Sequence, residues 1–253
     1  MNVRVPYLSE EAIEADAESL LAEYQLAWHP TSIPPVPVED ILENFLGLSL
    51  GFGDLREMLG FDDVLGATWV EGRSVVIDQS LSPEHPGTVE GRYSFTITHE
   101  IGHWRLHLPL CWKDPAQMGL FEEQRCQPSI VCRSSLAKER IELQADKYAA
   151  SLLMPRKMVL EAWRGEFGNL NSHYFSWDGP CFSNRPVFID NQPVDLENPT
   201  HRDIVIVEEF REIARRFALR FGVSVQAMQI RLENVGLLLR ERPLDLFSSR
   251  TPF

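Results

Sequence analysis

The sequence predicts an α+β fold, in which several amphipathic helices surround a small sheet. Two short runs rich in β-branched residues, 64–70 and 74–78, are separated by Glu71-Gly72-Arg73, a pattern typical of a hairpin. Along 141–153, apolar residues recur at helical spacing, and the same spacing returns along 208–221. With 253 residues, 44% of them hydrophobic, the chain can bury a substantial core.

Two helices are expected before the hairpin. Ser9 is placed to cap a helix over 10–24, whose apolar residues lie on one face. The proline-rich stretch 30–37 predicts a connector. A second, short helix is expected over 38–46, ended by Gly47. These elements are interpreted as scaffold.

The next stretch reads His99-Glu100-x-x-His103 and follows an apolar-rich run. Residues four apart lie on one face of a helix, so His99 and His103 can hold one metal ion while Glu100 leans towards the water that the metal activates. Two imidazole ligands and a carboxylate base are the arrangement of a zinc hydrolase. His107 continues the spacing but lies roughly 12 Å along the helix from His99, so we expect it to pack at the helix end.

The third ligand is expected from the helix over 141–153, which Pro155 terminates. Glu142 and Asp146 stand four apart at the edge of its apolar face. A solvated acidic edge is the alternative. Beside the histidine motif, we interpret Glu142 as the third zinc ligand and Asp146 as the acceptor of a ligand's free ring N–H, which fixes the histidine tautomer. Glu100 is then the catalytic general base.

The segments 92–103 and 142–155 resemble the ImmA/IrrE family of gluzincin-type zinc metallo-endopeptidases. Shorter stretches extend the resemblance over most of the chain, namely 4–9, 65–67, 75–78, 221–224 and 231–233. It implies a zincin-like minimal metallopeptidase core, made of a small sheet with an edge strand and the metal-binding helix. By resemblance, Gly66–Val70 is the edge strand that pairs with an extended peptide substrate, an ordinary hairpin being the alternative.

Two stretches depart from the family pattern. The insert between the metal motifs contains three cysteines, Cys111, Cys126 and Cys132. They form no Cys-x-x-Cys pair, so we expect no second zinc site, and ordinary thiols are favoured over a thiolate that blocks the catalytic zinc. Residues 163–203 are too long for a simple connection and rich in aromatic residues, which favours a packed lid. His173 and Tyr174 are candidate donors to the transition-state oxyanion, and the sequence chooses neither.

The C-terminal part has a different character. We divide the chain into a metallopeptidase domain, 1–200, and a helical helix-turn-helix-like segment, 201–253, with a turn at Gly222-Val223. The stretch from Arg211 to Arg242 contains seven arginines and three glutamates, which gives it a local net charge of +4. DNA contact is therefore one interpretation. Because the whole chain carries a net charge of −13, packing on the core or docking of a protein partner is favoured.

Composition excludes other classes. No apolar run reaches the length of a membrane span, no secretory signal is evident, and four cysteines do not make a disulfide scaffold, so a cytoplasmic protein is expected. The leading function, as the resemblance to the ImmA/IrrE family implies, is a zinc-dependent endopeptidase that cleaves a helix-turn-helix repressor or antitoxin-like partner and relieves repression of stress or mobile-element genes. The alternative is a non-proteolytic regulator that binds DNA or sequesters a repressor around a structural zinc. Glu100 favours the first, because a structural site needs no carboxylate beside the metal.

Overall fold

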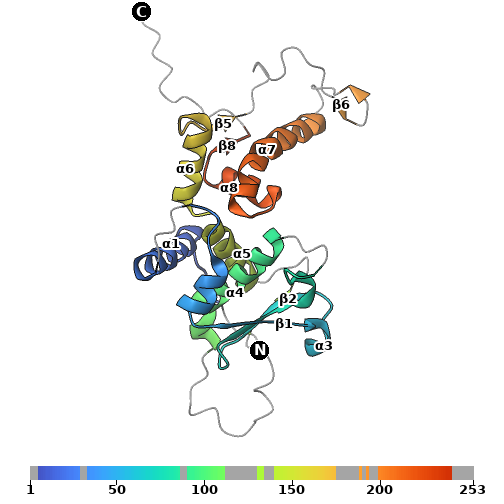
Figure 1. Ribbon diagram of the computed structural model, residues 1–253. Helices are drawn as coiled ribbons and strands as arrows, with labels where there is room; N and C mark the ends of the chain where they lie inside the picture. Colours follow the sequence, from blue (N-terminus) through green and yellow to red (C-terminus); the bar gives the residue numbers. More distant parts are fainter. Residues whose placement is uncertain are drawn as a thin grey trace, which may run out of the picture. The chain divides into compact units, whose positions relative to one another are not determined.

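The computed structural model describes residues 5–28, 33–85, 90–111, 130–133, 140–174, 188–189, 192–193 and 199–240 (Figure 1). Helices and small sheets are mixed in it, which is compatible with the predicted α+β class. The chain forms two compact units. The first contains Met1–Met158 and Leu219–Ser224, and the second contains Val159–Ala218 and Val225–Phe253.

A four-stranded sheet forms the base of the first unit. Its strands are β1 (Ser49–Gly53), β2 (Val64–Trp69), β3 (Ser74–Asp78) and β4 (Ile130–Arg133), in the order β1-β3-β2-β4. The predicted hairpin is confirmed, because β2 and β3 pair antiparallel with Ala67 opposite Val76. Strand β1 pairs parallel with β3, and helix α3 (Leu55–Leu59) packs its Leu55 against β2.

The expectation that Gly66–Val70 is an edge strand is wrong. Strand β4 pairs antiparallel with the other side of β2, with Thr68 opposite Ile130 and Gly66 opposite Cys132. The outer strands of the sheet, among the residues that the structure describes, are β1 and β4. The run Ile130-Val131-Cys132 is too short to show strand alternation, so the sequence did not predict the strand that pairs with the outer edge of β2.

Three helices are stacked on this sheet. Helix α4 (Glu90–Cys111) contacts β2 and β3, α5 (Arg140–Leu153) lies along α4, and α1 (Glu10–Ala27) packs against α5 (Figure 1). The predicted cap of α1 is confirmed, because Ser9 Oγ accepts a hydrogen bond from the Ala12 amide at 3.2 Å.

Shorter helical turns complete the first unit. The expected short helix is present as α2 (Val38–Asp40) continued by the π-helical η1 (Ile41–Phe45), and Gly47 follows at φ 64°. The 3-10 turn η2 (Gln79–Leu81) follows β3. The positive φ of Gly47 lies in the left-handed region, which suits glycine because it has no Cβ to clash there.

Helices α4 and α5 approach each other closely at Gly102. A Cβ placed there would lie 3.0 Å from the Cβ of Tyr148 and 3.2 Å from the Cα of Ala145. These distances are shorter than ordinary van der Waals contacts, so glycine lets the two helices meet without a gap. Gly102 stands between Glu100 and His103 in the sequence, and the close approach therefore occurs beside the histidine motif.

The second unit is built on α6 (Arg156–Phe167), α7 (Pro199–Phe221) and α8 (Val225–Asn234), with short strand pairs β5–β8 (His173–Tyr174, Leu238–Leu239) and β6–β7 (Phe188–Ile189, Gln192–Pro193). The rings of Trp163 and Phe217 stack with centroids 5.8 Å apart, and Arg216 pairs with Glu166 at 3.0 Å. Helix α6 thus packs on α7 within the second unit. The division into domains expected after residue 200 stays a prediction.

The expected helices at 208–221 and from Ser224 onward are present as α7 and α8, joined through Gly222 at φ 63°. Within the described part of the chain, none of the helices combines the length and the apolar character needed to cross a bilayer.

Candidate metal centre

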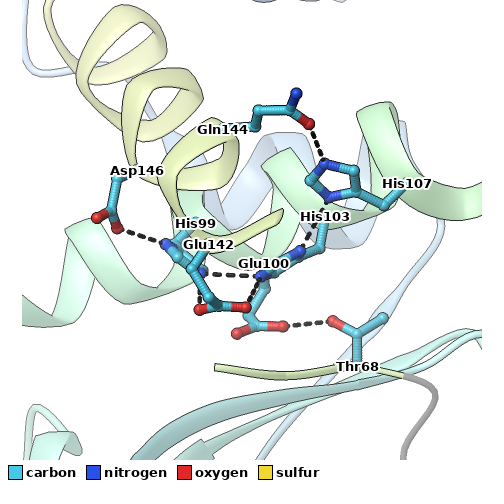
Figure 2. A network of polar contacts seen from close by, with 8 residues as sticks. All are labelled: Thr68, His99, Glu100, His103, His107, Glu142, Gln144 and Asp146. Atoms are coloured by element: carbon cyan, nitrogen blue, oxygen red, sulfur yellow. Dashed lines mark hydrogen bonds and ion pairs between the residues drawn. The ribbon is translucent and has the colours of Figure 1, made fainter. Parts of the chain in front are cut away.

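Two neighbouring helices bring the predicted ligands together. Helix α4 supplies His99 and His103, and α5 supplies Glu142 (Figure 2). One ligand atom from each lies within 4.8 Å of the others, and all three side chains are buried. This group could hold a metal ion, and it is the one such group among the residues that the structure describes.

Asp146 orients His99. Its Oδ1 lies 2.9 Å from His99 Nδ1, so the carboxylate accepts the ring N–H at that position. The other ring nitrogen, Nε2, is then unprotonated and faces Glu142 at 3.3 Å. Asp146 follows Glu142 by one helical turn, which places both carboxylates on the same side of α5.

The chemistry of the three groups fits a cation. His99 Nε2 and His103 Nε2 are 2.9 Å apart, and each lies 3.3 Å from an oxygen of Glu142. Burial alone would raise the pKa of Glu142, but the neighbouring His103 and His99 rings bring it down to about 2. A lone pair and a negative charge therefore converge in a buried space, and a bound cation would satisfy them together.

Glu100 lies beside these groups without belonging to them. It is fully buried, and its Oε2 accepts a hydrogen bond from Thr68 Oγ1 at 2.6 Å, while Oε1 has no hydrogen-bond partner in the described residues. Burial raises the pKa of Glu100 to about 7; His99 and the Thr68 hydrogen bond oppose the rise, and Glu142 adds to it. A carboxylate with such a pKa can both take up and release a proton near neutrality.

Strand β2 forms the wall opposite Glu100. Gly66 and Thr68 are two residues apart, so they face the same side of the sheet. A Cβ at Gly66 would lie 2.5 Å from Glu100 Oε1 and 3.1 Å from Thr96 Cγ2, so only glycine leaves room for the carboxylate. Both residues were predicted to belong to a substrate-binding strand, but their position against Glu100 was not predicted, because nothing within the strand's own sequence shows which residues its face contacts.

His107 differs from the expectation of a packing residue at the helix end. Helix α4 continues to Cys111, and His107 is fully buried. Its Nδ1 lies 3.0 Å from His103 Nδ1, and its Nε2 lies 2.9 Å from Gln144 Oε1 (Figure 2). Burial lowers the pKa of His107 to about 4, so the ring is neutral at pH 7. The regular four-residue spacing of His99, His103 and His107 was the feature of the sequence that could have indicated the contact between His103 and His107.

The remaining candidates fall elsewhere. His173 and Tyr174 belong to the second unit, where His173 Nε2 lies 2.8 Å from Glu209 Oε1. Cys126 and the side chains of Cys111 and Cys132 lie outside the described residues, as do 175–187 of the expected lid.

Comparisons with known proteins gave no match, either to protein-family models or to curated proteins. What the site can do is therefore inferred from its geometry and from the motifs themselves.

Proposed function

We propose that this protein is a zinc-dependent endopeptidase with a zincin-like core. His99, His103 and Glu142 would hold the zinc, and Glu100 would act as general base. The observation that carries the proposal is a buried carboxylate beside three buried ligand atoms, close to them but not one of them. A purely structural site has no use for such a group.

The ligand set supports zinc. Two imidazoles and one carboxylate leave a coordination position open, as in catalytic zinc sites, whereas structural sites are usually closed by four protein ligands. When bound, zinc lowers the pKa of a water molecule to about 7 and polarises a carbonyl group.

The chain's own residues account for the proton transfers. Thr68 holds Oε2 of Glu100 in place, which leaves Oε1 to accept a proton from the attacking water. Once the water oxygen has bonded to the carbonyl carbon, Glu100, with its pKa near 7, can pass this proton to the leaving amine nitrogen as the C–N bond breaks. Asp146 keeps His99 in the tautomer whose Nε2 can bind a metal.

The proposed substrate is a helix-turn-helix repressor, as the resemblance to the ImmA/IrrE family implies. Binding of a protein is favoured over binding of DNA, because α8 carries a single basic residue, Arg231, and its side chain is buried. On α7, Arg211, Arg215 and Arg216 are each paired with a glutamate. A recognition helix that binds DNA needs exposed cations to contact the phosphates, and α8 offers none.

The proposal is tested by Glu100→Gln, which keeps shape and hydrogen bonding but removes the base. Each form is co-expressed with a helix-turn-helix protein encoded beside it, and fragments are followed on a gel. We expect cleavage to slow by about 10²–10⁴, with zinc content unchanged. The matched control is Glu161→Gln, an exposed position on α6, which should cleave normally.

Two results would contradict the mechanism. Cleavage by Glu100→Gln at the wild-type rate would remove Glu100 as the base. Relief of repression by both forms without any fragments would favour sequestration of the repressor.

Glu142→Ala should retain much less zinc than wild type on metal analysis, and full occupancy would exclude Glu142 as a ligand.

A further inference from the structure

We propose that His107 is a positioning residue for the metal ligand His103. Together with Gln144 and the backbone carbonyl of Pro6, it forms a hydrogen-bond relay with one fixed direction, which holds His103 in the tautomer that can bind a metal. The inference rests on the proposed metal site and adds a role for His107, Gln144 and the N-terminal segment.

The relay is continuous and buried. His103 Nδ1 lies 3.0 Å from His107 Nδ1, and His107 Nε2 lies 2.9 Å from Gln144 Oε1 (Figure 2). Gln144 Nε2 in turn donates to the carbonyl oxygen of Pro6 at 2.8 Å. The side chains of His103, His107 and Gln144 are buried, so water does not compete for the two hydrogen bonds that join them, while the bond from Gln144 to Pro6 is partly buried.

The direction follows from the last group. A backbone carbonyl can only accept, so the amide NH₂ of Gln144 must face Pro6. The amide oxygen then faces His107 Nε2, and this nitrogen must carry the hydrogen. In a neutral imidazole, the other nitrogen is bare, and His107 Nδ1 therefore accepts from His103 Nδ1–H. His103 Nε2 is left with a free lone pair, directed at His99 Nε2 and Glu142.

The reverse orientation of the amide does not fit. With Gln144 flipped, its oxygen would face the Pro6 oxygen at 2.8 Å, and two acceptors would repel each other. The carbonyl of Pro6 thus determines, through two side chains, which nitrogen of His103 is protonated.

The N-terminal segment, residues 5–10, is held on the face of helix α5 that carries Gln144. Arg140 donates to the Val5 carbonyl at 3.2 Å, and Lys147 forms an ion pair with Glu10. These contacts on either side of Gln144 keep the Pro6 carbonyl in position. The two proposed ligands are therefore oriented differently: His99 by the carboxylate of Asp146, and His103 by a relay without charge.

Histidine tautomers give a direct test in the unaltered protein. Long-range ¹H–¹⁵N correlation spectra at neutral pH distinguish a protonated from a bare ring nitrogen. We expect the hydrogen of His107 on Nε2 and a bare Nδ1. A His107 ring protonated at Nδ1 would reverse the relay and overturn the inference.

Zinc affinity gives the second test, measured by competition with a chromophoric chelator on the full chain. His107→Leu removes the acceptor, and we expect zinc to bind about 10–100-fold more weakly. His107→Asn places an amide oxygen near the position of Nδ1 and should restore most of the affinity. The stability control is Ile13→Val in the buried face of α1, which should bind zinc as wild type does.

The outcomes separate the two proposals. If wild type binds zinc tightly and His107→Leu binds it equally well, the relay has no role, while the proposed endopeptidase stands. If wild type does not bind zinc, both proposals fail. Loss of affinity in Ile13→Val to the same extent as in His107→Leu would show that stability alone is responsible, and would also overturn the inference.

Discussion

Glu100 shows how a few atoms set the chemistry of the site. One of its oxygens is held by Thr68 at 2.6 Å, and the other has no partner in the described residues. A buried carboxylate with a single donor is costly to ionise, which is why its pKa rises to about 7. Thr68 thus limits a rise that burial would otherwise make larger.

Thr68→Val removes this donor while keeping the shape of the side chain. Because the hydrogen bond lowers the pKa of Glu100, its loss should raise that pKa further. The base would then be protonated up to a higher pH, and the acid limb of the cleavage profile should move upward by about 1 pH unit. The measurement is the rate at which the proposed repressor substrate is cleaved between pH 5 and 9.

Thr68→Ser is the matched control, because it retains the hydroxyl group and should keep the wild-type profile. Zinc affinity should be the same in all three forms, since the hydrogen bond of Thr68 goes to Glu100, which is not a proposed ligand. An unchanged profile in Thr68→Val would show that the hydrogen bond does not tune the base.

At the scale of elements, the site depends on how closely α4 and α5 approach. Glu142 and Asp146 come from α5, and their histidine partners come from α4. Gly102 allows the contact, because a Cβ there would meet Tyr148 and Ala145 at 3.0 and 3.2 Å. Metal ligation tolerates only small displacements, so the helix spacing sets the quality of the site.

Gly102→Ala should push the two helices apart and weaken zinc binding by roughly tenfold. The matched control is Gly165→Ala in α6, where a Cβ would meet no atom within 4 Å. The control should leave zinc affinity unchanged and stabilise the helix by up to about 1 kcal/mol. Equal zinc affinity in both variants, by chelator competition, would contradict the packing argument.

At the scale of the whole molecule, the two buried glutamates make stability depend on pH in opposite ways. The pKa of Glu142 falls to about 2 from an ordinary 4.5, so its contribution is present above pH 4.5 and is lost as the pH falls towards 2. The pKa of Glu100 rises from 4.5 to about 7, so its contribution is present below pH 4.5 and is lost as the pH rises through 7.

We therefore expect the metal-free protein to lose roughly 3 kcal/mol of unfolding free energy between pH 4.5 and well above 7 through Glu100. Glu100→Gln cannot ionise and should lack this loss. Urea unfolding of both forms, with a chelator present, measures the difference. Parallel pH dependence in the two forms would show that the pKa of Glu100 does not differ between the folded and the unfolded chain.

The sequence alone determined the features that depend on local spacing. Helix geometry places His99 above His103 and Glu142 above Asp146, and alternation and turn residues placed the β2–β3 hairpin. The cap at Ser9 is likewise a matter of a few neighbouring residues. The helix spacing, the hairpin and the cap each depend on residues within one element or one turn, so they can be predicted from the sequence alone.

Only the tertiary structure decided which side chains meet across elements. The pairing of β4 with β2, the packing of α6 on α7 and the contact of Thr68 with Glu100 join segments that are far apart in the sequence. The same is true of the relay from Pro6 to His103. Periodicity shows which face of an element is apolar, but the register and approach of two faces depend on how their side chains pack, and no spacing along one element contains that information.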